Sequence, residues 1–341
     1  MSTNESAVRT EKKQMGNLDV LRFLAALAVV CIHVVSAPVH AYEGVLRADL
    51  THTLETIHYL MDWSVPVFFI LTGYFCGKHA TYSYAFAWKK ARKFIIVLFT
   101  VGLFYGLLEC VFASNHLGLQ EIKTAFLNVL NRNLWDHMWF VYDIIGIYLV
   151  LPLLFAFFTK ARAPREQGIL VSLLFLLNIL LPWIGEHTAV KININFPLGA
   201  YLFYVCFGLL FSTCSLERIS RRARFGIAAV LILAGILAPL FGYAPQSYTD
   251  LFVCFLASGL FVLFLELPIP ATKGMTELAA CTWGVYLIHP FFINLAVKFF
   301  KIDLLNGMVF GKMLGFYLAV AAVSFLATFV LRRIPVIKAL F

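Results

Sequence analysis

The residues best suited to chemistry are an arginine and a histidine, Arg22 and His33, which lie eleven positions apart in a largely apolar stretch. On a helix that turns about 100° per residue, both side chains leave the same face, separated by about 16 Å along the axis. A guanidinium binds phosphate through paired N–H donors, and an imidazole accepts a hydroxyl proton near neutral pH. The pair therefore suits a reaction between a phosphate-bearing reactant and a hydroxyl. A structural histidine and an arginine at a membrane border are the competing interpretations.

Other polar residues also fall inside apolar stretches, where a buried charge is costly and a function is expected. The candidates to bind a second substrate are Asp62, Trp139, Tyr142, Asp143 and His289. Either aspartate could instead orient His33, and Trp139 could be an interfacial aromatic residue. His289 could share a cavity with His33 or make only a structural hydrogen bond. Asp19, three residues before Arg22, can pair with it on a helix.

Two prolines lie close to these candidates. Pro66 and Pro290 deprive the carbonyls of Asp62 and Tyr286 of their helical donors. Interrupted helices at membrane depth are tolerated where they line a cavity. A kink that serves packing alone is the alternative.

The elements that must position these residues are membrane helices. Of 341 residues, 61% are apolar and 13% are charged, against 45–50% and about 25% in soluble proteins. Since a spanning helix needs about 20 apolar residues, the sequence predicts an all-α protein with about ten spans. These are residues 18–39, 57–77, 94–114, 138–158, 168–184, 197–213, 225–242, 249–267, 279–297 and 311–331. Residues 121–133 have helical amphipathic spacing and are predicted to lie flat in the interface.

The net charge of +9 indicates an orientation, not nucleic-acid binding. Alternate loops carry 19 Lys and Arg on one side and 7 on the other, and the richer side is cytoplasmic. Both termini are therefore predicted to be cytoplasmic, as tails of residues 1–17 and 332–341 around a membrane domain of residues 18–331. The seven cysteines and the histidines lack redox or zinc spacing, so no metal is predicted.

Four segments, in order, resemble motifs of the acyltransferase 3 membrane family. They are residues 18–26 (LDVLRFLAA) with His33, 64–74 (SVPVFFILTGY), 139–152 (WFVYDIIGIYLVLP) and 284–290 (GVYLIHP). The resemblance implies transfer of an acyl group, usually acetyl from acetyl-CoA, to a hydroxyl of a glycan or lipid-linked saccharide. The chain is most similar to the stand-alone O-acetyltransferases of bacterial surface polysaccharides, such as that of enterobacterial common antigen. This implies a multi-pass protein of the bacterial inner membrane, with membrane lipid and polysaccharide assembly machinery as partners.

The resemblance also assigns site residues. His33 matches the essential motif histidine and Arg22 the motif arginine. The basic stretch Lys89, Lys90, Arg92 and Lys93 matches the basic entry to the third span, and with Arg22 it is expected to bind coenzyme A phosphates. A plain topology anchor is the alternative, and Arg218, Arg221, Arg222 and Arg224 compete for the same role. Thr72 departs from the serine usual before Gly73 but keeps the hydroxyl.

Two other functions remain open from the sequence. A saccharide or lipid transporter or flippase would also need many spans and intramembrane charges, although no internal repeat is visible. A non-catalytic membrane partner of a polysaccharide assembly complex is the third. For the transferase, the acyl group and a covalent acyl-enzyme intermediate are undecided.

Overall fold

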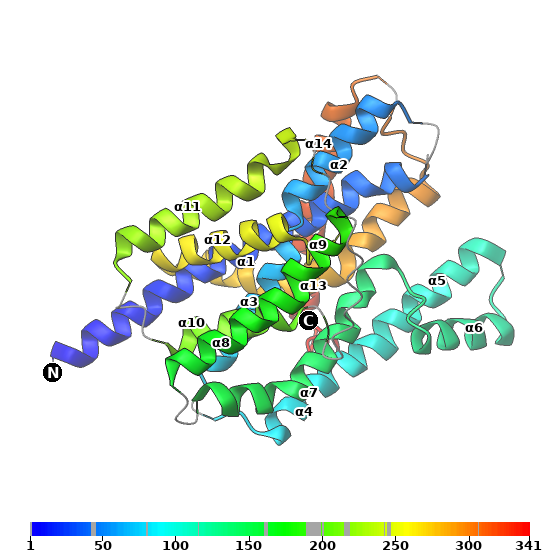
Figure 1. Cartoon of the computed structure of the whole chain (residues 1–341). Helices are drawn as coiled ribbons and strands as arrows, with labels where there is room; N and C mark the ends of the chain where they lie inside the picture. The colour runs from blue at the N-terminus through cyan, green and yellow to red at the C-terminus, as the bar shows by residue number, and fades with distance from the viewer. Residues whose placement is uncertain are drawn as a thin grey trace. The chain divides into compact units, whose positions relative to one another are not determined.

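The computed structural model describes residues 2–41, 46–79, 81–114, 116–159, 163–188, 199, 201–214, 219–241, 243, 247–305 and 307–341. In these ranges every regular element is helical (Figure 1), so the predicted all-α class is confirmed. The chain forms two compact units, Met1–Lys78 with Ala163–Arg332 and His79–Arg162 with Arg333–Phe341. Each unit is described by itself.

Eight helical segments of the described chain are long and apolar enough to cross a membrane. They correspond to eight of the ten predicted spans, while the sixth and eighth correspond to the shorter apolar helices Leu202–Thr213 and Leu251–Glu266. A helix of 16 residues is about 24 Å long, less than the hydrocarbon core of about 30 Å. Ten crossings therefore remain a prediction. The orientation in the membrane also remains a prediction. Part of the charge count behind it lies outside the described residues, namely Lys160, Arg162, Lys191, Arg218 and the basic side chains before residue 16.

The first unit holds most of the helices. They are α1 (Ser2–Ala41), α2 (Ala48–Met61), α3 (Ser64–Gly77), α8 (Pro164–Phe175), the π-helix η3 (Leu176–Leu180), α9 (Leu181–His187), α10 (Leu202–Thr213), α11 (Arg221–Leu237), the 3-10 helix η5 (Ala238–Phe241), α12 (Leu251–Glu266), α13 (Lys273–Asn294), the π-helix η6 (Leu295–Phe299) and α14 (Val309–Leu331). In Figure 1, α1 runs beside α12 and α13, against which it packs. Since α1 begins at Ser2, the helix extends into the predicted 1–17 tail.

The start of α1 is fastened to the junction between α12 and α13, residues 267–272. Asn17 donates to the Leu267 carbonyl, and its Oδ1 accepts from the Ile269 amide at 2.7 Å. A Cβ on Gly16 would lie 2.4 Å from the Ala271 nitrogen, so only glycine allows this approach. The contacts fix the axial position of α1 against both neighbouring helices.

The helices α3 and α10 cross at backbone contact. A Cβ on Gly73 would lie 1.9 Å from the Val205 carbonyl oxygen, and one on Gly208 would lie 2.0 Å from that of Ile70. Gly73 and Gly77 form the G-x-x-x-G spacing that lets membrane helices approach closely. The neighbouring Thr72 donates its hydroxyl to the Phe68 carbonyl at 2.8 Å, within its own helix.

The second predicted span is an interrupted helix. α2 ends at Met61, α3 begins at Ser64, and Asp62 and Trp63 form the break, as the position of Pro66 suggests. Pro290 instead lies inside the continuous helix α13. The carbonyl of Pro290 accepts from the Asn294 side chain at 2.9 Å, and the π-helix η6 follows directly.

The second unit contains α4 (Tyr84–Val97), the π-helix η1 (Leu98–Gly102), α5 (Leu103–Ser114), α6 (Leu119–Leu130), the 3-10 helix η2 (Asp136–Met138) and α7 (Trp139–Thr159). α4 packs on α7, and α5 packs on α6. α6 confirms a helix over most of the predicted segment 121–133 and ends at Leu130; it buries Ala125 and Val129 and leaves Ile122 and Phe126 exposed. Its position in a membrane interface stays a prediction.

Candidate active site

His33 and His289 lie against each other in the first unit. Their ring centroids are 5.0 Å apart, and the ring planes are tilted by 48°. His33 belongs to α1 and His289 to α13, the helices whose relative height the Asn17 contacts fix. The structure therefore brings together two of the residues that the sequence nominated.

The orientation of His289 follows from its hydrogen bond. Its ring is fully buried, and Nδ1 lies 2.8 Å from the Val285 carbonyl oxygen. A carbonyl can only accept, so we assign the hydrogen of the neutral ring to Nδ1, which makes Nε2 an acceptor. His289 is thus held in one tautomer and one orientation beside the half-buried ring of His33.

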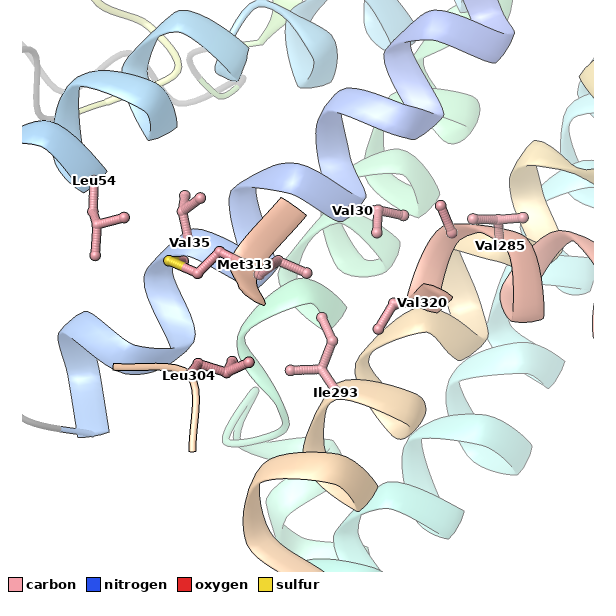
Figure 2. Close-up of a cluster of buried hydrophobic side chains, with 10 residues drawn as sticks. Val30, Val35, Leu54, Val285, Ile293, Leu304, Met313 and Val320 are labelled. Carbon is pink, nitrogen blue, oxygen red and sulfur yellow. The ribbon is translucent and has the colours of Figure 1, made fainter. Parts of the chain in front are cut away.

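Aliphatic side chains surround this pair. Val30 and Val34 on α1 and Val285 and Ile293 on α13 belong to one buried cluster, with Val320 from α14. Figure 2 shows Val30, Val285, Ile293 and Val320 converging from these three helices. Apolar surroundings lower the effective dielectric, which strengthens the interactions of any charge that forms there.

Arg22 is held at the other end of the same α1 face. Its Nη1 lies 4.0 Å from Asp19 Oδ1, which fulfils the predicted pairing, and its guanidinium carbon lies 4.9 Å from the centre of the Phe75 ring. Asp19 is itself buried and accepts from Thr276 Oγ1 at 3.0 Å. The Arg22 side chain remains 29% exposed. Its guanidinium is therefore oriented and still accessible from one side.

Asp62 lies at the break between α2 and α3 and is buried. Its Oδ1 is 3.2 Å from His58 Nε2, one turn earlier, in a geometry that makes no hydrogen bond. No described group donates a hydrogen bond to this oxygen. Asp62 thus keeps the acceptor capacity that a substrate hydroxyl would use.

Trp139, Tyr142 and Asp143 lie in α7 of the second unit. Asp143 accepts from Arg132 Nη2 at 3.1 Å, and the Arg132 guanidinium carbon lies 5.2 Å from the centre of the Tyr142 ring. These contacts hold the end of α6 against α7. Their predicted role toward a sugar stays a prediction, with this structural role as a second explanation for Tyr142 and Asp143.

The predicted coenzyme A cluster lies on α4, also in the second unit. Lys89, Lys90 and Arg92 are exposed, whereas Lys93 is half-buried and donates to the carbonyl of Phe341 at 3.5 Å. Lys90 Nζ lies 5.4 Å from the centre of the Phe86 ring. The first three side chains thus present positive charge to solvent, as a phosphate-binding face would.

The competing arginine cluster is engaged with an acidic residue. Arg224 makes two hydrogen bonds to Glu266, at 2.6 and 3.1 Å, and Arg221 donates to the Glu266 carbonyl at 2.9 Å. These bonds tie α11 to the end of α12. A carboxylate thus already occupies the guanidinium fork of Arg224 that a phosphate would need, whereas Arg222 is exposed and Arg218 lies outside the described residues.

Within the described ranges, no group of three His, Cys, Asp or Glu side chains is arranged to hold a metal ion. A cavity of about 620 Å³ opens near the starts of α2 and α14, lined among others by Arg47, Asp49, Thr53, Leu305 and Phe310. It contains none of the predicted site residues.

The fold and site define a multi-pass helical membrane protein with a histidine pair in its core and an arginine on the same face of the first span. The profile of the acyltransferase 3 family, described as an acyltransferase domain, matches residues 15–333. The chain belongs to this family of membrane acyltransferases, which confirms the family expected from the four sequence segments.

A curated relative supports the assignment. YfiQ of Bacillus subtilis (strain 168), provisionally described as a membrane-bound acyltransferase, is 20% identical over 312 residues, which span 82% of this chain and 81% of the relative. No solved structure matches the chain.

Proposed function

We propose that this protein transfers an acetyl or other small acyl group from acyl-CoA to a hydroxyl of a cell-envelope polysaccharide or lipid-linked saccharide. We place it in the inner membrane of a bacterium, among stand-alone O-acetyltransferases of the enterobacterial common antigen type, beside the machinery that assembles the polysaccharide. The observation that carries the proposal is the contact between the half-buried His33 ring and the buried His289 ring, 5.0 Å between centroids, with His33 on the α1 face that also bears Arg22.

In this proposal Arg22 binds the acyl donor, acyl-CoA. Its guanidinium, held between Asp19 and Phe75, offers N–H donors to a coenzyme A phosphate. His33 lies eleven residues further along α1, about 16 Å away. The long pantetheine arm of coenzyme A would bridge that distance and bring the thioester to the histidine pair.

In this proposal His33 activates the hydroxyl of the acceptor saccharide. Its imidazole takes the hydroxyl proton while the hydroxyl oxygen attacks the thioester carbonyl. The carbon–sulfur bond then breaks, and the coenzyme A thiolate leaves and recovers the proton from the His33 imidazolium. The products are an ester and free coenzyme A thiol, and His33 returns to its neutral form. His289 keeps the His33 ring in position.

Mass spectrometry of envelope glycans from cells with and without the gene tests this function. We expect a mass increment of one acyl group only when the gene is present. Purified protein should release free thiol from acetyl-CoA when the acceptor glycan is added. If the protein instead moves saccharide across vesicles and releases no thiol, it is a transporter.

Removing the arginine should weaken donor binding. For Arg22→Ala we expect the KM for acetyl-CoA to rise about tenfold or more, the loss of a hydrogen bond to a charged group, with a smaller change in kcat. Arg22→Lys should recover part of the affinity as a point charge. Thiol release against acetyl-CoA concentration measures this, with the exposed Lys123→Ala as control. An unchanged KM in Arg22→Ala contradicts the assignment.

His289 is expected to act as a positioning residue. His289→Phe keeps a ring in the core but removes both nitrogens, so we expect kcat to fall roughly tenfold, about the value of one buried hydrogen bond. The pH profile of kcat/KM should also shift, because the environment of His33 changes. His289→Gln, which retains a polar group, should recover part of the rate. A slower enzyme with an unmoved pH profile would indicate a merely structural residue.

A further inference from the structure

A polar layer crosses the first unit at the depth of the histidine pair. Asn17 fastens α1 to the α12–α13 junction, so heights along α1, α12 and α13 can be compared by counting residues from that end. Counted from that junction, His33, His289 and Asp250 all lie 16 or 17 residues away. At 1.5 Å per residue, each is about 25 Å from that junction. Asp250, at the start of α12, therefore lies at a similar height along the helices to the histidine pair.

Aromatic rings gather around Asp250. Tyr243 donates its hydroxyl to Asp250 Oδ2, and Trp183 Nε1 donates to the Tyr243 hydroxyl at 2.6 Å. The ring of His187 stacks on Trp183 and on Tyr243, each at 5.0 Å between centroids. His187 is exposed, Trp183 and Tyr243 are half-buried, and Asp250 is buried. The group therefore runs from solvent to a buried carboxylate.

Burial, together with the hydrogen bond to Asp250, raises the pKa of Tyr243. Its hydroxyl thus stays protonated and keeps donating to the Asp250 carboxylate. The other oxygen, Asp250 Oδ1, accepts from the Phe252 amide at 2.9 Å and begins α12. These two bonds fix the plane of the carboxylate, which is what a binding site requires of an orienting polar group.

Asp62 adds a second acid to this group. The Asp62 carboxylate is near enough to that of Asp250 for the two charges to repel each other, and it also lies near Tyr59, whose hydroxyl donates to the Gly235 carbonyl. Asp62 Oδ1 is buried and makes no hydrogen bond of good geometry among the described residues, although His58 Nε2 lies 3.2 Å from it. The amide Nδ2 of Asn178, in the π-helix just before α9, is also buried without a partner among them. Such orphaned polar atoms are rare in proteins and call for a ligand or water.

We propose that Trp183, His187 and Tyr243, with the carboxylates of Asp62 and Asp250, bind the pyranose ring of the acceptor glycan. The inference rests on the proposed function and names the acceptor site within it. Aromatic rings offer apolar faces to the C–H faces of a sugar, and carboxylates accept from its hydroxyls. A sugar held here lies at the depth of His33, where one of its hydroxyls must be deprotonated.

The local chain geometry fits this use. The π-helix η3 leads into α9, and Pro182, in the first turn of α9, has no N–H donor. π-Segments within α-helices frequently occur at functional sites. Trp183 and His187 follow four residues apart, so both rings leave one face of α9 toward Tyr243.

Three variants test the site against a matched control. Trp183→Ala, Asp62→Asn and Asp250→Asn change the ring face and the two acids, and asparagine keeps the helix cap that Asp250 provides. Trp283→Ala removes a half-buried tryptophan of the same unit, which belongs to α13 and stacks on Tyr286. Each variant is assayed for the acyl increment on envelope glycans in cells and, after purification, for acetyl-CoA binding by calorimetry.

We expect each of the three variants to lose about tenfold or more of glycan acylation, the effect of one hydrogen bond to a charged group or one sugar contact. Their acetyl-CoA binding should equal that of the wild type and of Trp283→Ala. Undiminished glycan acylation in all three variants overturns the acceptor site and leaves the proposed function intact. Parallel loss of acetyl-CoA binding overturns it too, because the group would then be structural. An absent increment in wild-type cells refutes the proposed function itself.

Discussion

Replacing His33 with alanine is expected to abolish acyl transfer while the protein still inserts and folds. General-base catalysis contributes about 10²–10⁴-fold to a rate, so we expect kcat to fall by at least about a hundredfold. The half-buried ring lies beside His289 in an aliphatic cluster, where no other described side chain of α1 could replace its nitrogen at the same depth. Thiol release from acetyl-CoA by purified protein, with the acceptor glycan present, measures the loss.

The loss must be separated from misfolding. His33→Gln keeps a polar side chain of similar size, and we expect it to be as inactive as His33→Ala but to elute as a monodisperse species with wild-type thermal stability. His52→Ala removes an exposed histidine from α2 and should leave both activity and stability unchanged. Wild-type turnover in a well-folded His33→Gln variant would show that this residue is not the base.

The sequence predicted the helices well because their signal is local. Long apolar runs without interruption specify membrane helices, and each of the ten predicted spans overlaps an apolar helix. The starting point of α1 and the length of α12 depend on tertiary contacts such as the bonds from Asn17 to the α12–α13 junction, which no local pattern encodes. The break at Asp62 was predicted only in part. The position of Pro66 indicated an interrupted helix, but nothing in the sequence indicated that α2 is a separate helix before the break.

The candidate site was predictable only where one helix contains it. The spacing of Arg22 and His33 places both on one face, whereas the contact of His33 with His289 joins residues more than 250 positions apart. Asp250 was missed although it stands at the edge of the predicted span 249–267. The signal that could have indicated a site was an acidic residue at the end of a span, together with Trp183 and His187 at helical spacing. Its meaning depends on Tyr243, which only the fold brings near.

The second large effect concerns stability, at the crossing of α3 and α10. Gly73→Ala would place a Cβ 1.9 Å from the Val205 carbonyl oxygen, and Gly208→Ala would place one 2.0 Å from that of Ile70. Both obstacles are backbone atoms, so the helices must separate. Overpacking of this kind costs about 1–3 kcal/mol or more. We expect each variant to lower the thermal unfolding midpoint in detergent markedly and to reduce the yield of folded protein.

A glycine-to-alanine substitution at an uncrowded helical position should instead raise the thermal unfolding midpoint. A Cβ on Gly315, inside α14, meets nothing within 4 Å, and alanine favours a helix over glycine by roughly 0.5–1 kcal/mol. Gly77→Ala should fall between these cases, because its Cβ would meet the Ser212 side chain, which can rotate away. A midpoint in Gly73→Ala as high as in Gly315→Ala would contradict the backbone contact. The crossing also matters for activity, since α3 carries Phe75 to Arg22, and Gly73→Ala protein that still folds should show a raised KM for acetyl-CoA.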